Sequence, residues 1–336
     1  MSLENLGWSS HWERLWASWN REQHEAGRVL ISHGHQCLVS TAGGNRLCTR
    51  AGKLDESPVT GDWVVIRETR MEAILPRRTA FTRKAPGEGT RPQVLAANID
   101  VAFLVCGLDG DYNVRRLERY VYLARQSGAR PVIVLNKADV CEDVESRVEE
   151  CVRLGVEVIA LSALHDEALS PLIRQVALGE TAVLLGSSGA GKSTIANRLR
   201  GFEAQRTQAV REHDSRGRHT TTHRELMPLD FGWLLMDVPG IRELQLWSGE
   251  EGEGLEETFA EIAEWAEQCR FRDCGHEGEP GCAVAQALEE GRIDAGRWQN
   301  FRKMQKELAH QERETNARKA QEHKQWVKRI HKMMRS

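Results

Sequence analysis

The sequence predicts three parts: a small N-terminal all-β barrel, a central α/β domain built on a parallel sheet, and a mainly helical C-terminal part that carries metal-ligating side chains. Three observations support this prediction. Short β-branched runs separated by turn residues fill positions 28–92. Continuous apolar runs alternate with helical stretches from about 97 to 247, as the buried strands of a parallel sheet require. Three cysteines and one histidine then lie close together between Cys269 and Cys282.

Changes in composition set the expected boundaries. We place an N-terminal tryptophan-rich helix at 1–26, the barrel at 27–92, the α/β domain at 97–250, the cysteine-containing domain at 251–296 and a basic helical tail at 297–336. The chain of 336 residues is 40% hydrophobic and 28% charged, close to the average for globular proteins. It shows no apolar run of about 20 residues and no secretory signal at its start, and its eight cysteines are too sparse for a disulfide scaffold. We therefore expect a reduced, cytoplasmic protein without a membrane partner.

The N-terminal segment has a regular aromatic spacing. Trp8, Trp12, Trp16 and Trp19 follow one another at steps of four, four and three, which places them on one face of a helix with Leu15 beside them. Aromatic stripes of this kind usually pack against a protein body. We expect the helix to dock on the rest of the chain rather than to bind a ligand.

The barrel prediction depends on three β-runs, at 28–31, 36–40 and 62–66, which are separated by turn clusters at 42–45 and 60–61. A five-stranded oligonucleotide-binding (OB) barrel fits the length and the charge, although the periodicity alone fits an SH3-like barrel equally well. Basic side chains are grouped at the end of this segment: Arg77, Arg78, Arg83 and Lys84.

The central domain carries polar motifs at the ends of its apolar runs. The expected strands lie at 101–106, 131–135, 156–161, 182–185 and 233–236, and each of the last four ends where a motif begins. Ligands of open α/β sheets bind beyond the carboxyl ends of the strands. The position of the motifs therefore supports their assignment independently of their sequence.

Residues 186–193 (Gly-Ser-Ser-Gly-Ala-Gly-Lys-Ser) match the phosphate-loop pattern in full. Glycines allow consecutive backbone N–H groups to converge on the phosphates. Lys192 is expected to reach the β and γ phosphates, and the Ser193 hydroxyl to bind Mg²⁺. Downstream, Asp237 is expected to hold Mg²⁺ through water, and the Gly240 amide to bond the γ-phosphate. Between these motifs lies a polar first switch, residues 216–222, from which Thr221 would complete the Mg²⁺ shell.

Residues 136–139 (Asn-Lys-Ala-Asp) predict that the base of the bound nucleotide is guanine. The Asp139 carboxylate can accept two hydrogen bonds from guanine that adenine does not offer, so adenine would leave it without partners. Ser162 and Ala163 fit the accessory motif that contacts the base oxygen. The expected nucleotide-binding residues are thus Asn136, Lys137, Asp139, Ser162, Ala163, Gly186, Ser187, Ser188, Gly189, Ala190, Gly191, Lys192, Ser193, Thr194 and Gly240.

The order of the motifs is unusual, because the guanine motif precedes the phosphate loop, whereas an ordinary GTPase has the phosphate loop first. This order predicts a circularly permuted P-loop GTPase. Small regulatory GTPases also carry a water-orienting Gln after Asp-x-x-Gly, where this chain has Ile241. We therefore expect slow unaided hydrolysis. His219 is the candidate that completes the catalytic set with Lys192 and Thr221, with a structural or RNA-facing role as the alternative.

Cys269, Cys274, His276 and Cys282 offer three thiolates and one imidazole within fourteen residues. Structural zinc takes four such ligands in a closed tetrahedron. The intervening residues include glycines and a proline that can wrap a metal. We therefore expect one structural zinc ion rather than a catalytic one, because four protein ligands leave no position for water.

Charge is distributed unevenly along the chain. From Arg297 onward the chain has twelve basic and four acidic side chains, so the tail carries about +8, while the net charge of the whole chain is −3. A basic tail on an acidic body favours a polyanionic partner such as RNA. A solvated helix with internal ion pairs is the alternative. The stretch 309–325 has no large apolar side chain, so it cannot pack into a core and is expected to order on a partner.

Taken together, the motifs resemble the ribosome small-subunit-dependent GTPase A family, the bacterial circularly permuted GTPases of ribosome assembly. The resemblance covers nearly the whole chain. It rests on 6–8 (Leu-Gly-Trp), 61–64 (Gly-Asp-Trp-Val), 97–100 (Ala-Asn-Ile-Asp), 136–139, 186–193, 217–222 (Gly-Arg-His-Thr-Thr-Thr), 237–240 (Asp-Val-Pro-Gly) and 282–284 (Cys-Ala-Val).

The resemblance implies an OB barrel, a permuted GTPase and a zinc domain that together bind the small ribosomal subunit and its rRNA during late maturation, with GTP, Mg²⁺ and one Zn²⁺. It also implies that hydrolysis is slow in the free protein and faster on the subunit. A monomer is expected. The sequence leaves two alternatives open: an RNA-binding assembly factor that GTP switches without turnover, and a GTPase of the large subunit.

Overall fold

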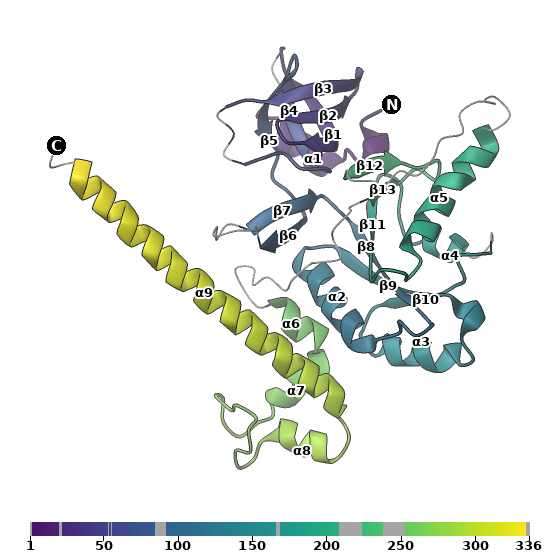
Figure 1. Ribbon diagram of the computed structural model, residues 1–336, viewed down its shortest axis with the longest axis vertical. Coiled ribbons are helices and arrows are strands. Elements are labelled where there is room, and N and C mark those ends of the chain that lie inside the picture. The colour runs from purple at the N-terminus through teal and green to yellow at the C-terminus, as the bar shows by residue number, and fades with distance from the viewer. Residues whose placement is uncertain are drawn as a thin grey trace. The chain divides into compact units, whose positions relative to one another are not determined.

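The computed structural model describes residues 2–19, 22–52, 54, 56–84, 92–165, 169–207, 224–237 and 253–333. The chain divides into two compact units, one made of 1–81 and 94–243 and the other of 82–93 and 244–336. The first unit contains the barrel and the α/β domain, and the second contains the C-terminal helices (Figure 1).

The barrel has five strands that close on themselves. Their order is β1-β2-β3-β5-β4, and β4 pairs with β1 to complete the ring. β3 and β5 are parallel, whereas the other pairs are antiparallel. This is the ring order of an OB barrel, so the OB prediction is confirmed and the SH3-like alternative is not. The strands are β1 (Glu25–His33), β2 (Gln36–Thr41), β3 (Gly44–Arg50), β4 (Trp63–Arg67) and β5 (Arg70–Ile74).

The α/β domain is a six-stranded stretch of the same continuous sheet, in the order β10-β9-β8-β11-β13-β12. The first five strands are parallel, and β12 runs antiparallel to β13. The strand before the phosphate loop, β11, lies in the middle of the sheet although it comes late in the chain. The predicted permuted P-loop fold is therefore confirmed. The strands are β8 (Val101–Gly107), β9 (Arg130–Asn136), β10 (Glu157–Ala160), β11 (Thr181–Leu185), β12 (Glu225–Pro228) and β13 (Leu234–Asp237).

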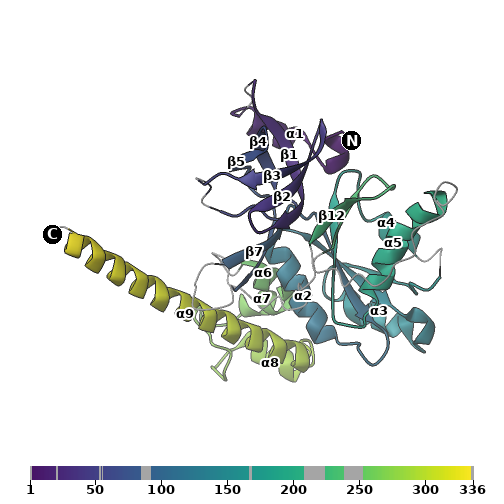
Figure 2. The same cartoon turned by 45° about the horizontal axis from the view of Figure 1, so that its top comes forward.

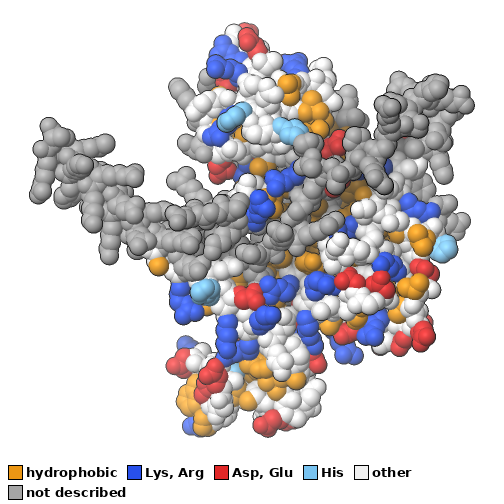
Figure 3. All heavy atoms as spheres, in the orientation of Figure 1, with side chains coloured by type: hydrophobic (Ala, Val, Ile, Leu, Met, Phe, Trp, Pro, Cys, Tyr) orange, Lys and Arg blue, Asp and Glu red, His pale blue; other side chains and the backbone are white. Residues whose placement is uncertain are grey.

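Helices flank this sheet on its two faces (Figures 1 and 2). They are α2 (Val114–Gln126), α3 (Val144–Val152), α4 (Ser170–Ile173) and α5 (Lys192–Thr207), with a short 3-10 turn at Ala138–Val140. Phe103, Ile195 and Trp233 belong to the core between sheet and helices. On the face drawn in Figure 3, acidic and basic side chains are interspersed over α2 and α3, so the charges described there form a mixed surface.

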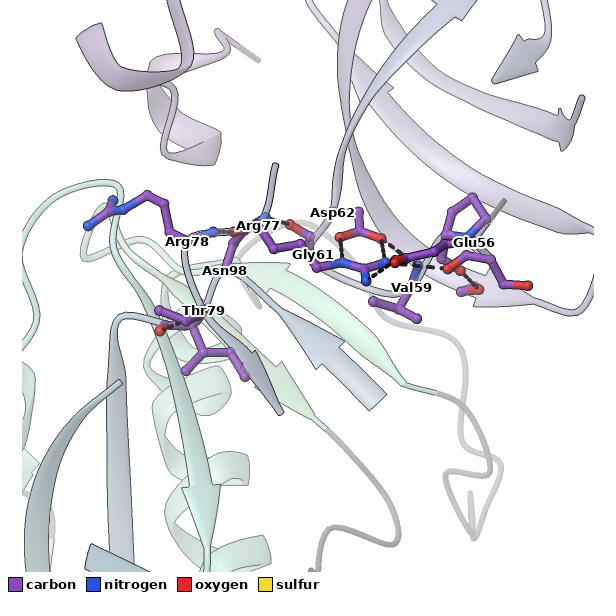
Figure 4. Close-up of polar contacts among 12 residues, drawn as sticks. Glu56, Val59, Gly61, Asp62, Arg77, Arg78, Thr79 and Asn98 are labelled. Atoms are coloured by element: carbon purple, nitrogen blue, oxygen red, sulfur yellow. Dashed lines mark hydrogen bonds and ion pairs between the residues drawn. The ribbon is translucent and has the colours of Figure 1, made fainter. Parts of the chain in front are cut away.

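Two of the sequence motifs form the joint between barrel and α/β domain. Gly61 has φ +94°, and a Cβ on it would lie 2.0 Å from the carbonyl oxygen of Ala97, so only glycine permits this close approach. Asn98 donates to the Gly61 carbonyl at 3.0 Å and accepts from the Arg78 amide at 2.9 Å (Figure 4). The motifs at 61–64 and 97–100 thus bind each other, although they belong to different domains.

A buried ion pair lies next to this joint. Asp62 is fully buried, and its two carboxylate oxygens accept from Arg77 Nε at 2.7 Å and from an Arg77 terminal nitrogen at 2.8 Å (Figure 4). The Val59 amide donates a third bond at 2.8 Å. Burial raises the pKa of Asp62, and the guanidinium opposes that rise. The pair therefore satisfies a charge that water does not reach.

A second buried arginine joins three segments of the first unit. Arg28, on β1, donates to the carbonyl oxygens of Leu6, Gly61 and Asn98 and, at 2.8 Å, to the Thr181 hydroxyl on β11. Burial lowers the pKa of Arg28 to about 10, so the side chain stays charged at neutral pH. Arg28 fixes the barrel, the N-terminal segment and the α/β sheet to one another.

The helix in the N-terminal segment is shorter than predicted. A 3-10 turn (Glu4–Leu6) ends at Gly7, and α1 covers only Ser10–Trp16. Trp8 therefore precedes the helix, because Gly7 adopts a left-handed conformation and Ser9 is extended, and Trp19 lies beyond the last helical residue. Trp8 still packs edge-on against Trp63 with ring centroids 4.8 Å apart, so the expected docking role holds although the single continuous helix does not.

The second unit is built from helices α6 (Glu253–Thr258), α7 (Ala260–Ala266), α8 (Ala283–Glu289) and α9 (Ala295–Met333). α6 and α7 are separate helices, because the backbone of Phe259 leaves the helical conformation between them. α9 is helical through the stretch 309–325, which was expected to order only on a partner. A hairpin of β6 (Ala80–Lys84) and β7 (Pro92–Ala97) spans the boundary between the units. Within the described residues, no helix is long and apolar enough to cross a bilayer.

Candidate nucleotide and metal sites

The predicted nucleotide motifs gather at one edge of the sheet in the first unit. The phosphate loop, residues 186–193, follows β11. The guanine-recognition loop, residues 136–139, begins at the end of β9, and Ser162 and Ala163 follow β10. Parallel strands β9, β10 and β11 bring these carboxyl ends to the same side. Motifs up to about fifty residues apart in sequence thus become neighbours.

The phosphate loop depends on backbone positions that only glycine fits. Gly186 has φ +146°, and a Cβ on it would lie 2.1 Å from the Val105 carbonyl oxygen. α5 begins at Lys192, within the last two residues of the loop, and the N-terminus of a helix is a site where backbone N–H groups are free to bind an anion. Lys192 Nζ donates back to the carbonyl oxygens of Gly186, at 2.7 Å, and of Ser187. The loop is therefore preformed, and the Lys192 ammonium lies against its backbone.

Asn136 connects the three motifs. The side chain is 3% exposed, donates from Nδ2 to the Ala190 carbonyl at 2.9 Å, and accepts at Oδ1 from the Ala163 amide at 2.9 Å. Gly191 lies against it: a Cβ there would come within 2.0 Å of Asn136 Nδ2. Sequence spacing predicted Asn136 as a nucleotide contact, and the geometry gives it a part in the assembly of the site.

Asp139, the predicted guanine acceptor, is exposed and open to a ligand. The nearby Ser162 hydroxyl lowers the pKa of Asp139, so the carboxyl is ionised at neutral pH. Ionisation is what allows both oxygens to accept hydrogen bonds. The site therefore offers an acceptor pair of the type that guanine recognises.

The phosphate side of the site is described in part. Ser193 and Thr194 lie in the first turn of α5, with Ser193 exposed. Asp237 ends β13, and its Oδ2 lies 3.1 Å from a terminal nitrogen of Arg200 on α5. His219, Thr221, Gly240 and Ile241 lie outside the described residues. Two further residues, Asp109 and Asp111, belong to no sequence motif and contact the site from the loop after β8.

In the second unit, Cys269, Cys274, His276 and Cys282 present one ligand atom each, all within 4.8 Å of one another. His276 Nδ1 lies 3.5 Å from Cys269 Sγ and 3.4 Å from Cys282 Sγ, and these two sulfurs are 4.0 Å apart. A tetrahedron with Zn–S bonds of about 2.3 Å has edges of about 3.8 Å. Burial lowers the pKa of His276, which favours the neutral imidazole that binds metal. The donor set fits a closed four-coordinate zinc site.

Comparison with known proteins gives consistent matches. Residues 74–247 match the family model described as RsgA GTPase. The chain is 41% identical to a protein of Opitutus terrae named small ribosomal subunit biogenesis GTPase RsgA, over 100% of this chain and 98% of that one. It is 43% identical to a protein of the same name from Leptospira interrogans, over 92% and 90%.

Two solved structures are similar over most of the chain. The crystal structure of YjeQ from Thermotoga maritima matches with a TM-score of 0.64 and 26% identity, over 85% of this chain and 99% of that chain. YloQ, described as a circularly permuted GTPase, matches with a TM-score of 0.64 and 25% identity, over 86% and 96%.

Proposed function

Because the chain belongs to the RsgA GTPase family, we propose that it binds the small ribosomal subunit, acts in the late maturation of that subunit, and hydrolyses GTP there to GDP and phosphate. The observation that carries the proposal is that Asn136 joins the guanine-recognition loop to the phosphate loop in a protein whose relatives match it over nearly their whole length. The assignment of the small subunit rests on the names of those relatives.

The nucleotide-binding roles follow from the geometry of this edge. Asp139 pairs with guanine, and the backbone of the accessory motif at Ser162 and Ala163, which Asn136 fixes through the Ala163 amide, contacts the base oxygen. The backbone of 186–191 surrounds the phosphates. Lys192 leaves the carbonyl oxygens of its own loop and turns to the β and γ phosphates, which are better partners for an ammonium than neutral carbonyl groups. Ser193, Thr194 and Gly240 complete the contacts.

Two metal ions belong to the proposal. Mg²⁺ is held by Ser193 and Thr221 and, through water, by Asp237, and when bound it neutralises charge on the β and γ phosphates. One Zn²⁺ is held by Cys269, Cys274, His276 and Cys282 as a structural ion. His219 is proposed to complete the catalytic group, because Ile241 has no polar atom with which to orient water.

The protein is proposed to act in the cytoplasm as a monomer that contacts rRNA. The OB barrel and the basic α9 support this partner, because OB barrels bind nucleic acids and basic side chains attract phosphate. We expect the contacts to follow RNA shape and phosphates rather than unpaired bases.

Co-sedimentation with purified ribosomal subunits tests this partner. We expect the protein to pellet with the small subunit, more strongly with a non-hydrolysable GTP analogue than with GDP, and to be released as salt rises. Equal pelleting with the large subunit, or binding that ignores the nucleotide, would contradict the proposal. A Ser193→Ala variant should lose Mg²⁺-dependent turnover.

A further inference from the structure

The loop after β8 lies between the two halves of the nucleotide site. We name residues 107–112 (Gly-Leu-Asp-Gly-Asp-Tyr) the acidic turn. β8 has β9 on one side and β11 on the other, so the turn emerges between the guanine-recognition loop and the phosphate loop. Gly107 pairs with Asn136, and the Leu108 amide donates to the Asn136 carbonyl at 2.7 Å. None of the nucleotide motifs includes this turn.

Asp109 contacts the guanine-recognition loop. Its Oδ2 lies 2.5 Å from Lys137 Nζ, and this ammonium lowers the pKa of Asp109. The alkyl chain of Lys137 passes close to Gly107, where a Cβ would lie 3.5 Å from Lys137 Cδ. Lys137 also has φ +64°, a conformation that non-glycine residues adopt only when their surroundings fix them. The ion pair is one of the contacts that fix it.

Asp111 contacts the phosphate loop. Its Oδ2 accepts a hydrogen bond from the Ser187 hydroxyl, and its Oδ1 accepts from Arg116 at 2.7 Å. Arg116 belongs to α2, and its amide donates to Asn113, the N-cap of that helix, at 3.0 Å. The Asp111 amide in turn donates to Asp109 Oδ1 at 3.1 Å. The two carboxylates thus form one unit that is anchored on α2.

We propose that Asp109 and Asp111 are positioning residues for the guanine nucleotide: Asp109 holds Lys137 and the loop that binds the base, while Asp111 holds Ser187 and the loop that binds the phosphates. The acidic turn sets the spacing between the two loops before the ligand arrives. Each carboxylate has its own cation, Lys137 or Arg116, so the turn adds little repulsion toward the phosphates. This role rests on the proposed function, because it acts on the same nucleotide site.

The expected signature is weaker binding with unchanged chemistry. A preformed site avoids the ordering that a loose site must undergo on binding. Since the ion pair is about one-third exposed, its contribution is modest, and we expect a three- to tenfold rise in the Kd for GDP in Asp109→Asn and in Asp111→Asn. The kcat at saturating GTP should stay within about twofold, because neither carboxylate touches the reacting atoms.

Fluorescence titration of the full chain with a methylanthraniloyl derivative of GDP measures the change in Kd. Asp230→Asn, an exposed aspartate in the turn before β13, is the matched control and should bind like the wild type. Ser187→Ala removes the partner instead of the carboxylate and should weaken binding as Asp111→Asn does. The combination of Ser187→Ala with Asp111→Asn should weaken binding no further than either change alone, which a general loss of stability would not produce.

Two results would count against the proposal, and they can be told apart. If the wild type binds the probe and both aspartate variants bind it equally well, the positioning role is wrong and the nucleotide site stands. If the wild type itself does not bind the probe, both the positioning role and the nucleotide-binding part of the proposed function are wrong.

Discussion

Arg77 contacts two carboxylates in very different surroundings, and this contrast gives a quantitative prediction. Asp62 is fully buried, whereas the Glu56 side chain, 2.6 Å from Arg77 Nη1, is 68% exposed. In an Arg77→Met variant, Asp62 Oδ1 loses its bond to Nε and Oδ2 keeps only the Val59 amide. Water does not reach these oxygens, so the buried carboxylate is left largely unpaired.

The expected loss follows from the number of bonds removed. Two hydrogen bonds to a charged group at about 1.5–3 kcal/mol each amount to a loss of about 3–6 kcal/mol in the free energy of unfolding, which overlaps the loss of about 3–5 kcal/mol found when one partner of a buried ion pair is removed. Glu56→Gln should cost less than about 1 kcal/mol, because its carboxylate is hydrated. Combining Arg77→Met with Asp62→Asn should recover about half of the loss, since the amide removes the charge and keeps an acceptor for Val59.

Urea unfolding followed by tryptophan fluorescence measures these differences, since Trp63 is the next residue after Asp62. The loss in Arg77→Met should also grow from pH 5.5 to pH 8. Without the guanidinium, the pKa of Asp62 in the folded state rises further above its unfolded value, so the folded state binds the proton more tightly and loses stability as pH rises. Equal effects of Arg77→Met and Glu56→Gln, or a loss independent of pH, would refute this reasoning.

Three further predictions concern the two sites and the core. Gly191→Ala should raise the Kd for GDP by about a hundredfold, because its Cβ would meet Asn136 at 2.0 Å and the residue has φ +97°; Gly201→Ala, with open space around it, is the control for a titration. Cys282→Ala should abolish zinc binding, measured as metal per chain, and expose α8 amides to hydrogen exchange, because this sulfur also accepts from the Ala285 amide at 3.3 Å; Cys141→Ala should retain the metal. Burial raises the pKa of the Cys151 thiol from 9.0 to about 11, so the folded state binds this proton more tightly than the unfolded state. Its contribution of about 3 kcal/mol should be present below pH 9 and lost as pH rises through 11, and Cys151→Ala should flatten the stability measured across that range under reducing conditions.

The fold was predictable where burial leaves a strong pattern in the sequence. β8, β9 and β11 are buried on both faces and therefore read as continuous apolar runs, and phosphate loops have a nearly fixed sequence. In contrast, β3 and β5 each contain a single fully buried side chain, Cys48 and Met71, so their polar sequences gave no strand signal. β12 was missed for a similar reason, because only Leu226 is buried in it.

The residues of the candidate site were likewise predictable only where they lie in recognisable motifs. Asn136, Asp139 and Lys192 lie in motifs whose spacing is diagnostic, whereas Asp109 and Asp111 act through contacts that depend on strand order. One signal was present: the acidic turn follows a buried strand of the same parallel sheet, and all such strands end at the ligand edge. The helical break at Phe259 and the late start of α1, after Gly7 and Ser9, depend on single backbone conformations, which periodicity does not specify.

Steady-state GTP hydrolysis, measured for the protein alone and with purified small or large ribosomal subunits, tests the central claim most directly. We predict slow turnover of the protein alone, since Ile241 occupies the position of a water-orienting residue, and strong stimulation by the small subunit only. Stimulation by the large subunit, or by neither subunit, would contradict it.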